Sequence, residues 1–285
     1  MARLTSPEIR SALLLALAAL MIPLIPNEPM GPYGALNPSR IWRLAVLVLA
    51  IGAFGQFSMR LLGPRWGLPL SGLASGFVSS AATVGAMAFK AVQAPGVLDA
   101  AVAGAVLSTV ATVAQMAAVL AATNEKTLAA MTIPLVFAGI VAGGYGLAFT
   151  LRALRTPTEG SRPAGAPLGI KTALIFTATL SIVTLASAAA RARFGEAGVV
   201  AAGALEGFVD AHAAAISIAS LVAAGHLEPA KAVWPILAGF TTNALTKVVV
   251  AAMAGRRTYA IRVVPGVFLV VLAAWAGALL ARRAG

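Results

Sequence analysis

Residues 129–153 read AAMTIPLVFAGIVAGGYGLAFTLRA, with one charged side chain, Arg152, close to the end. An α-helix rises about 1.5 Å per residue, so about 20 apolar residues cross the hydrocarbon core of a bilayer, which is about 30 Å thick. A strand of a membrane barrel would instead alternate polar and apolar residues over about ten positions. This stretch therefore predicts a transmembrane helix.

Eight further stretches have the same character. The chain of 285 residues is 60% apolar and 11% charged, with a mean hydropathy of +0.91, which lies outside the range of soluble domains. We predict an all-α polytopic membrane protein with about nine transmembrane helices. The other eight stretches run from 10 to 26, 41 to 62, 68 to 92, 97 to 122, 169 to 190, 198 to 224, 229 to 254 and 260 to 281. No small-residue cleavage pattern follows the first, so we expect a retained helix rather than a signal peptide.

The charged residues indicate lipid contacts. The formal net charge is +12, but Lys and Arg residues occur singly or in pairs near the ends of the predicted helices, as interfacial anchors do. We therefore expect contact with lipid headgroups and no binding of nucleic acid. These residues divide equally between the two faces, so the positive-inside rule leaves the orientation open. The absence of cysteine excludes disulfides, thiolate metal ligands and cysteine nucleophiles.

The sequence aligns with itself at an offset of 131 residues, which predicts an internal repeat. Aligned landmarks include Gly72 with Gly203, Gly76-Phe77-Val78 with Gly207-Phe208-Val209, and Pro134 with Pro265. We predict an N-terminal transmembrane helix and Pro/Gly-rich loop at 1–39, repeat 1 at 40–153, a polar linker at 154–170 and repeat 2 at 171–285. Four spanning helices per unit would make the repeats parallel, whereas one helix that does not span would make them inverted.

Two acidic residues fall inside the stretch 198–224, which reads AAGALEGFVDAHAAAISIASL between 201 and 221. Glu206 and Asp210 are spaced i, i+4, so an unbroken helix would place both carboxylates on one face, with His212 nearby. Charges at bilayer depth cost at least about 2.5 kcal/mol each, so they normally face a partner or a wet cavity. We interpret the carboxylates as candidate ion ligands or proton carriers. A lone histidine such as His212 is more often a packed residue than a metal ligand.

The next stretch carries Asn243 and Lys247, also spaced i, i+4. Lys247 needs a carboxylate partner, and Asp210 or Glu206 on the preceding stretch is the nearest candidate. We therefore expect an ion pair between Lys247 and one of these two residues. Repeat 1 has neutral counterparts, because Ser75, Ser79, Thr112 and Met116 stand at the positions of Glu206, Asp210, Asn243 and Lys247. Since only the second copy is charged, we expect a site at the repeat interface, where Ser79 and Ser80 add hydroxyl oxygens. A structural ion pair that fixes helix packing is the alternative.

A G-x-x-x-G pair precedes these polar positions in both repeats, at Gly72 and Gly76 and at Gly203 and Gly207. One interpretation is close helix packing, the usual role of such pairs in lipid. The other is an interrupted helix, in which the second glycine ends one half and Ser79 or Asp210 caps the next. The sequence leaves both open.

Five segments together resemble a known family: GALNPSRIW (34–42), RLLGPRWG (60–67), GLASGFVSSAAT (72–83), LEGFVDAHAAAIS (205–217) and TTNALTK (241–247). They are similar to the MgtC/SapB-associated membrane family of unknown function, in which this domain usually follows an MgtC-type domain. The resemblance spans about Thr5 to the C-terminus. It implies a multi-pass protein of the bacterial inner membrane, loosely linked to metal-ion homeostasis.

The same resemblance implies a set of polar family positions, namely Ser79, Ser80, Asp210, Asn243 and Lys247. The family's second aspartate is His212 here, which weakens the case for a hard-cation site. The MgtC-type domain is missing from this sequence, so we expect a stand-alone protein, a homo-oligomer or a separately encoded MgtC-type partner.

We expect a secondary transporter or permease for a small ion, because duplicated membrane folds are typical of transporters. Glu206, Asp210 and Lys247 together carry one net negative charge, which favours a cation, and the two carboxylates are the ligands if that cation is a metal. No cofactor is expected. The alternative is an accessory or regulatory membrane subunit with a structural ion pair. An intramembrane enzyme is not expected, because the sequence pairs no nucleophile with a base.

Overall fold

The computed structural model describes residues 6–32, 36–43, 67–93, 95–155, 196–208 and 210–284, with single residues at 46, 185, 189, 192 and 193. Its regular elements are helices, apart from an isolated bridge between Met30 and Leu36. They are α1 (Ser6–Leu20), η1 (Ile22–Leu24), α3 (Gly67–Gln93), η4 (Pro95–Val97), α4 (Leu98–Thr123), α5 (Glu125–Leu154), α7 (Glu196–Gly207), α8 (Ala211–Ala223), α9 (Pro229–Ala254) and α10 (Arg257–Ala284).

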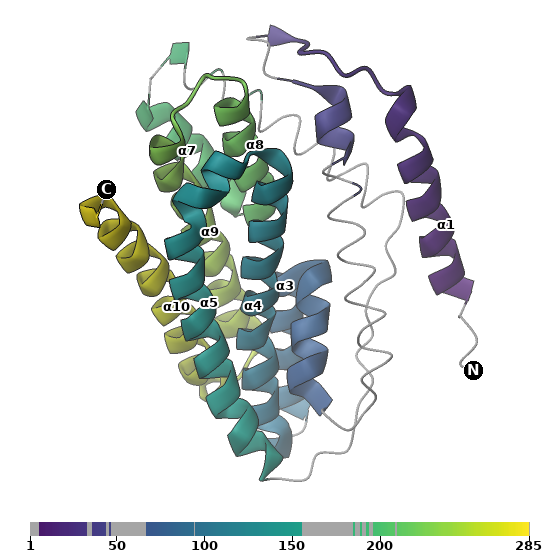
Figure 1. Cartoon of the computed structure of the whole chain (residues 1–285). Helices are drawn as coiled ribbons and strands as arrows, with labels where there is room; N and C mark the ends of the chain where they lie inside the picture. The colour runs from purple at the N-terminus through teal and green to yellow at the C-terminus, as the bar shows by residue number, and fades with distance from the viewer. Residues whose placement is uncertain are drawn as a thin grey trace.

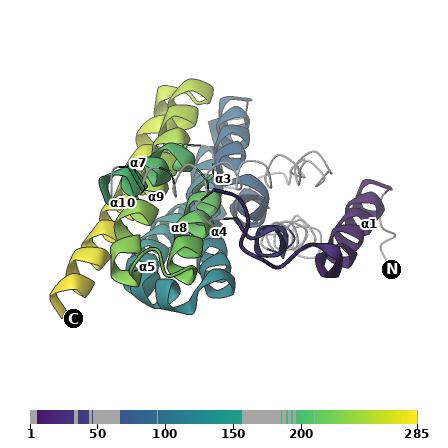
Figure 2. The same ribbon diagram turned by 90° about the horizontal axis from the view of Figure 1, so that it is seen from above.

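Five helical segments are long and apolar enough to span a membrane, judged by length and composition alone, although the first of them, in α3, turns back on itself at Ser79. Their apolar spans are Leu68–Val92, Leu98–Thr123, Glu125–Leu154, Pro229–Ala254 and Arg257–Arg283. The predicted helical membrane class is confirmed at this level. The stretches 41 to 62 and 169 to 190 lie almost wholly outside the described residues, so the count of nine helices stays a prediction. Helix α1 stands apart from the bundle of α3 to α10 in both views (Figures 1 and 2), and Nε1 of Trp42 donates to the backbone oxygen of Ala18 at 2.7 Å.

Helix α3 turns back on itself at Ser79. The backbone of this residue is extended, with φ −165° and ψ 110°, within a segment of 27 residues that is otherwise helical. The hydroxyl oxygens of Ser75 and Thr83 lie 2.8 Å apart across the turn. In an unbroken helix, residues with this spacing would be about 12 Å apart along the axis. Two half-helices, 67–78 and 80–93, therefore meet at Ser79.

Both halves of α3 also touch one residue of α4. A β-carbon added at Gly104 would lie 2.7 Å from the backbone oxygen of Leu68 and 3.1 Å from Sδ of Met87. In a straight helix Leu68 and Met87 would be about 28 Å apart. Only a hairpin brings both to one glycine, so the stretch 68–92 does not form the straight helix expected from its apolar length.

The stretch 198–224 is also broken, as in the interrupted-helix interpretation that the sequence left open. Helix α7 ends at Gly207 and α8 begins at Ala211. The backbone of Asp210 between them is extended, with φ −156° and ψ 114°. These angles are close to those of Ser79, the residue 131 positions earlier.

Helices α7 and α8 form the second hairpin, and both arms reach the same point of α9. A β-carbon added at Gly239 would lie 2.8 Å from the backbone oxygen of Gly203 on α7 and 3.0 Å from Cβ of Ala214 on α8. In an unbroken helix Gly203 and Ala214 would be about 16 Å apart. The chain therefore reverses direction at Asp210.

Both interpretations of the G-x-x-x-G pairs hold, because the glycines before each break also pack closely against the following helix. The contacts are Gly72 with Gly104, Gly76 with Ser108, Gly203 with Pro235 and Gly207 with Gly239. The last two contacts repeat the first two with both partners shifted by 131 residues. Small residues thus let each first arm approach the backbone of α4 or α9.

The two hairpins enter the helix bundle from opposite ends. In Figure 1, α3 lies in the lower half of the molecule, and α7 and α8 lie in the upper half. One cluster of buried residues joins the end of α4 and the start of α5 to α8 and the start of α9. A second cluster joins α3 and the start of α4 to the end of α9 and the start of α10. Each hairpin thus packs at its own end of the bundle.

Helices α5 and α10 run antiparallel. In the last third of α5, the Tyr145 hydroxyl donates to the backbone oxygen of Arg262, near the start of α10, at 2.6 Å. Near the start of α5, Pro134 contacts Gly277, close to the end of α10. Asp99, at the start of α4, forms an ion pair with Arg262. Helix α4 therefore runs in the direction opposite to α9, and α5 runs in the direction opposite to α10.

Candidate functional site

Asp210 lies at the tip of the second hairpin, where it caps α8. Its side chain accepts a hydrogen bond from the backbone N–H of His212 at 2.8 Å, as N-cap residues do. Nδ1 of His212 lies 2.9 Å from the same carboxylate oxygen. The Asp210 side chain is 26% exposed and that of His212 is 13% exposed. The carboxylate is therefore held at the turn and is still accessible.

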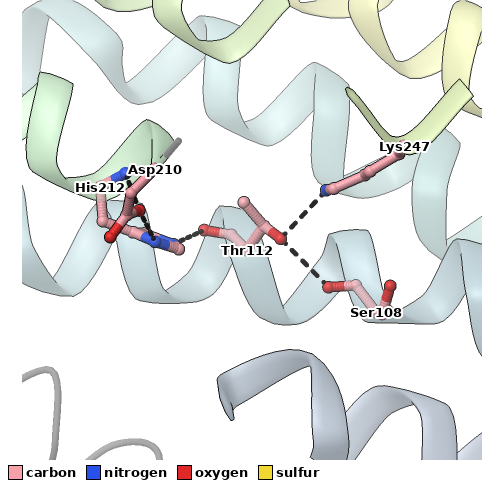
Figure 3. Close-up of polar contacts among 5 residues, drawn as sticks. All are labelled: Ser108, Thr112, Asp210, His212 and Lys247. Atoms are coloured by element: carbon pink, nitrogen blue, oxygen red, sulfur yellow. Dashed lines mark hydrogen bonds and ion pairs between the residues drawn. The ribbon is translucent and has the colours of Figure 1, made fainter. Parts of the chain in front are cut away.

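A threonine on α4 connects this pair to Lys247 (Figure 3). Nε2 of His212 lies 3.3 Å from the backbone oxygen of Thr112. Nζ of Lys247 donates to the Thr112 hydroxyl at 3.3 Å and to the Thr109 hydroxyl at 3.4 Å. Lys247 is 1% exposed. Figure 3 shows Asp210 and Lys247 on either side of Thr112.

The predicted ion pair between Lys247 and a carboxylate is not formed within the described ranges, where the hydrogen-bond partners of Lys247 are two neutral hydroxyls. The physical reason is the break in the helix. A helix start leaves backbone N–H groups without partners, and the carboxylate of Asp210 turns toward those of α8. Asp210 and Lys247 are brought together only through His212 and Thr112.

Glu206 lies in the last turn of α7 and is 6% exposed. Its Oε1 atom is buried and accepts no hydrogen bond from any described residue. Because α7 ends at Gly207, Glu206 belongs to one arm of the hairpin, and Asp210 begins the other. A buried carboxylate oxygen without a partner is costly. A bound cation or a proton would satisfy it.

Ser79 has the same position in the first hairpin as Asp210 has in the second. Its Oγ accepts a hydrogen bond from the backbone N–H of Ala82 at 3.2 Å. Ser79 is exposed, whereas Ser80 is buried. In the part of the chain that the structure describes, no hydrogen bond connects either serine to Asp210. The two hairpins are thus capped alike, but the serine pair is not joined to the charged group.

Helix α9 holds the second hairpin from the side. Thr242 donates to the backbone oxygen of Ala204 at 2.6 Å, and Thr246 donates to that of Phe208 at 3.1 Å. Asn243 on the same helix is buried, one turn before Lys247. The predicted Asn243–Lys247 pair therefore lies on the helix that fixes the hairpin carrying Asp210.

The described residues contain no group of three or more His, Cys, Asp or Glu side chains that could together hold a metal ion. Glu206 and Asp210 supply carboxylates, so a bound cation would need further oxygens. Hydroxyls, side-chain amides and backbone carbonyls are ligands that hard cations accept. Ser79, Ser80 and Asn243 offer such oxygens.

Sequence reasoning missed the polar face of α4. Ser108, Thr109, Thr112 and Gln115 are all buried, each at most 3% exposed. Their spacing places them on one side of a helix. That pattern is visible in VLSTVATVAQ (106–115) and would have indicated a neutral polar partner for Lys247.

Comparison with known proteins gives a family but no characterised relative. Residues 46–255 match the model of a family described as a domain of unknown function (DUF4010). The matched range contains both hairpins and every candidate residue discussed above. No curated protein and no solved structure matches the chain.

Proposed function

The chain belongs to the DUF4010 family, whose model covers well over half of it, and we propose that this member is a secondary transporter or permease for a small ion, preferably a cation. One observation carries the proposal: two helical hairpins enter from opposite ends, with Ser79 and Asp210 at their tips. At membrane depth, interrupted helices occur where the backbone is buried in protein or lines a cavity. Transporters build substrate sites from such helices.

We further propose that 40–153 and 171–285 are inverted repeats. The hairpin breaks and the glycine contacts recur at an offset of 131 residues. Helix α4 runs opposite to its counterpart α9, and α5 runs opposite to its counterpart α10. The end of α5 and the start of α7 lie at opposite ends of the bundle, which agrees with one crossing by the predicted stretch 169 to 190. Inverted repeats place a site at their interface near the midplane.

A cation is the preferred substrate because of the charge balance and the unpaired oxygen of Glu206. Glu206 and Asp210 contribute two negative charges and Lys247 one positive charge, which leaves one net negative charge. We assign Asp210 and Glu206 as ligands or proton carriers, with Asn243, Ser79 and Ser80 as neutral oxygen donors. His212 positions Asp210 through their hydrogen bonds.

We propose the bacterial inner membrane as the location, with lipid around the helices. Large apolar side chains on the outer helices, such as Ile140, Leu147, Ile261 and Phe268, are more than half exposed. A continuous apolar surface of this kind is expected to face lipid tails. A homo-oligomer or a separately encoded MgtC-type partner stays a prediction.

The test is ion uptake into proteoliposomes. Wild-type protein is compared with Asp210→Asn and Glu206→Gln for uptake of Na⁺, K⁺, Mg²⁺ and Mn²⁺ at two pH values. Glu125→Gln is the matched control, because Glu125 is exposed in the first turn of α5. We expect the wild type and the control to take up one of these cations and both site variants to lose that flux while remaining folded.

No uptake of any ion by stable wild-type protein would contradict the transporter proposal. In that case the accessory-subunit alternative would be favoured. Equal flux in wild type and Asp210→Asn would instead show that the Asp210 carboxylate is not needed for ion uptake.

A further inference from the structure

We propose that Lys247 is a built-in competitor of the transported cation, and that cation binding at the carboxylates is accompanied by release of a proton from Lys247. This inference rests on the proposed function, because it assigns the coupling of the same site. It makes the protein an exchanger of a cation for a proton.

The first support is the environment of Lys247. A buried ammonium group normally has a carboxylate partner, because an unpaired charge at this depth is costly. Lys247 is 1% exposed, and its hydrogen bonds go to the hydroxyls of Thr109 and Thr112. A carboxylate accepts N–H bonds but has no hydrogen to donate to the lone pair of a neutral amine. A hydroxyl can accept from an ammonium and can also donate to a neutral amine. The Thr112 hydroxyl donates to the backbone oxygen of Ser108 at 3.2 Å, so Thr109 is the hydroxyl that would donate to the amine.

The second support is the small number of groups that could exchange with Lys247. Several of the described titratable groups on the helices that pack against α9 already bond to other residues or lie near the ends of their helices. Asp99 is paired with Arg262, Tyr259 donates to the backbone oxygen of Val84, and Lys90 lies in the last turn of α3.

The groups that remain lie at the hairpin turn. They are Glu206, with its unpaired Oε1, and the Asp210–His212 pair, which Thr112 connects to Lys247. The two carboxylates are therefore the partners for which an ammonium and a substrate cation would compete.

The exchange can be written with charges balanced. In one arrangement the Lys247 ammonium neutralises a hairpin carboxylate. When a cation takes that place, the N–H bond of Lys247 breaks, the proton leaves to bulk water, and the neutral amine moves to the hydroxyls of Thr109 and Thr112. The arrangement in the structure, with the lysine on hydroxyls, is the one that accepts the cation.

The repeat provides a natural neutral variant. Met116 stands in repeat 1 at the position of Lys247 and is fully buried. Replacing a buried charge by an apolar residue of similar volume is often tolerated. Lys247→Met should therefore fold, and it removes the titrating group without shortening the side chain greatly.

The experiment measures cation flux and internal pH together in proteoliposomes, using each of the four cations named above. We expect an inward cation gradient to drive protons out through the wild type. In Lys247→Met, the number of protons moved out per cation moved in should fall to zero, whatever the change in the rate of cation flux. Lys231→Met is the control, because this lysine lies at the exposed start of α9. It should keep the wild-type ratio of protons to cations.

A binding measurement on wild-type protein makes the test independent of how the variant folds. Calorimetric titration of the cation in two buffers with different ionisation enthalpies counts released protons, and we expect about one per bound cation. Cation binding without proton release, or unchanged coupling in Lys247→Met, would overturn this inference and leave the transporter proposal intact. No cation binding and no flux in the wild type would overturn both.

Discussion

At the scale of single residues, Asp210 has two functions that can be separated. It caps α8 through the backbone N–H of His212, and it carries a charge beside Thr112 and Lys247. Asparagine caps helices as well as aspartate does, whereas alanine does not. The two substitutions therefore distinguish the structural function of this side chain from its electrostatic one.

We predict that Asp210→Ala lowers the free energy of unfolding by about 1 kcal/mol, since a cap is lost, and that Asp210→Asn leaves it nearly unchanged. Thermal unfolding in detergent measures the difference. Both variants should lose ion uptake, because both lack the charge. Equal destabilisation by Asn and Ala would argue against the cap.

At the scale of elements, each hairpin depends on close approach to one helix. A β-carbon at Gly76 would lie 2.7 Å from the backbone oxygen of Ser108. At Gly143 on α5, a β-carbon would meet nothing within 4 Å. The same chemical change thus has opposite steric consequences at these two glycines.

We predict that Gly76→Ala destabilises the protein by about 1–3 kcal/mol through overpacking. Gly143→Ala should be neutral or slightly stabilising, because alanine favours the helix. Unfolding midpoints of the two variants, measured side by side, check this. A Gly76→Ala variant as stable as the wild type would mean that the first arm of α3 does not lie against α4.

The second hairpin has side-chain bonds to α9 that the first lacks on α4. Thr242 and Thr246 bond the carbonyls of Ala204 and Phe208, whereas their repeat-1 counterparts, Ala111 and Gln115, form no such bond among the described residues. The second hairpin therefore has two side-chain anchors whose contribution can be measured separately from backbone packing.

We predict that Thr242→Val and Thr246→Val each cost about 0.5–1 kcal/mol and increase amide exchange in α7. Hydrogen-exchange mass spectrometry measures the exchange helix by helix. Thr132→Val is the control, because its hydroxyl bonds only within α5. Exchange that rises equally in all three variants would contradict the proposed anchoring.

At the scale of the whole molecule, the direction of the helices decides the topology. Inverted repeats place equivalent loops on opposite sides of the membrane, whereas parallel repeats place them on the same side. Gly96, before α4, and His226, before α9, are nearly equivalent at the repeat offset, and both are exposed.

We predict that cysteines at Gly96 and Arg256 are labelled from one side of the membrane and cysteines at Lys126 and His226 from the other. The natural chain contains no cysteine, so a single introduced thiol gives an unambiguous signal. A membrane-impermeant maleimide applied to oriented vesicles makes the measurement. Labelling of Gly96→Cys and His226→Cys from the same side would contradict inversion.

The class of protein and the candidate polar residues follow from the amino-acid sequence. Apolar length predicts membrane helices because each residue makes its own contribution to transfer into lipid. The intramembrane positions of Glu206, Asp210 and Lys247 and the offset of 131 residues follow from the same local patterns. These features could be predicted because they depend on residue identity and spacing alone.

The positions where the apolar stretches turn, and the partners of the buried charges, depend on contacts between distant segments. A hairpin and a straight helix have the same hydropathy, and the reversal at Ser79 depends on the glycine contacts with α4, which are long-range. Lys247 donates hydrogen bonds to Thr109 and Thr112 instead of pairing with a carboxylate. The reason is that the chain reversal directs the Asp210 side chain to the start of α8. Partner choice thus depends on packing between segments distant in the chain, which local spacing does not encode.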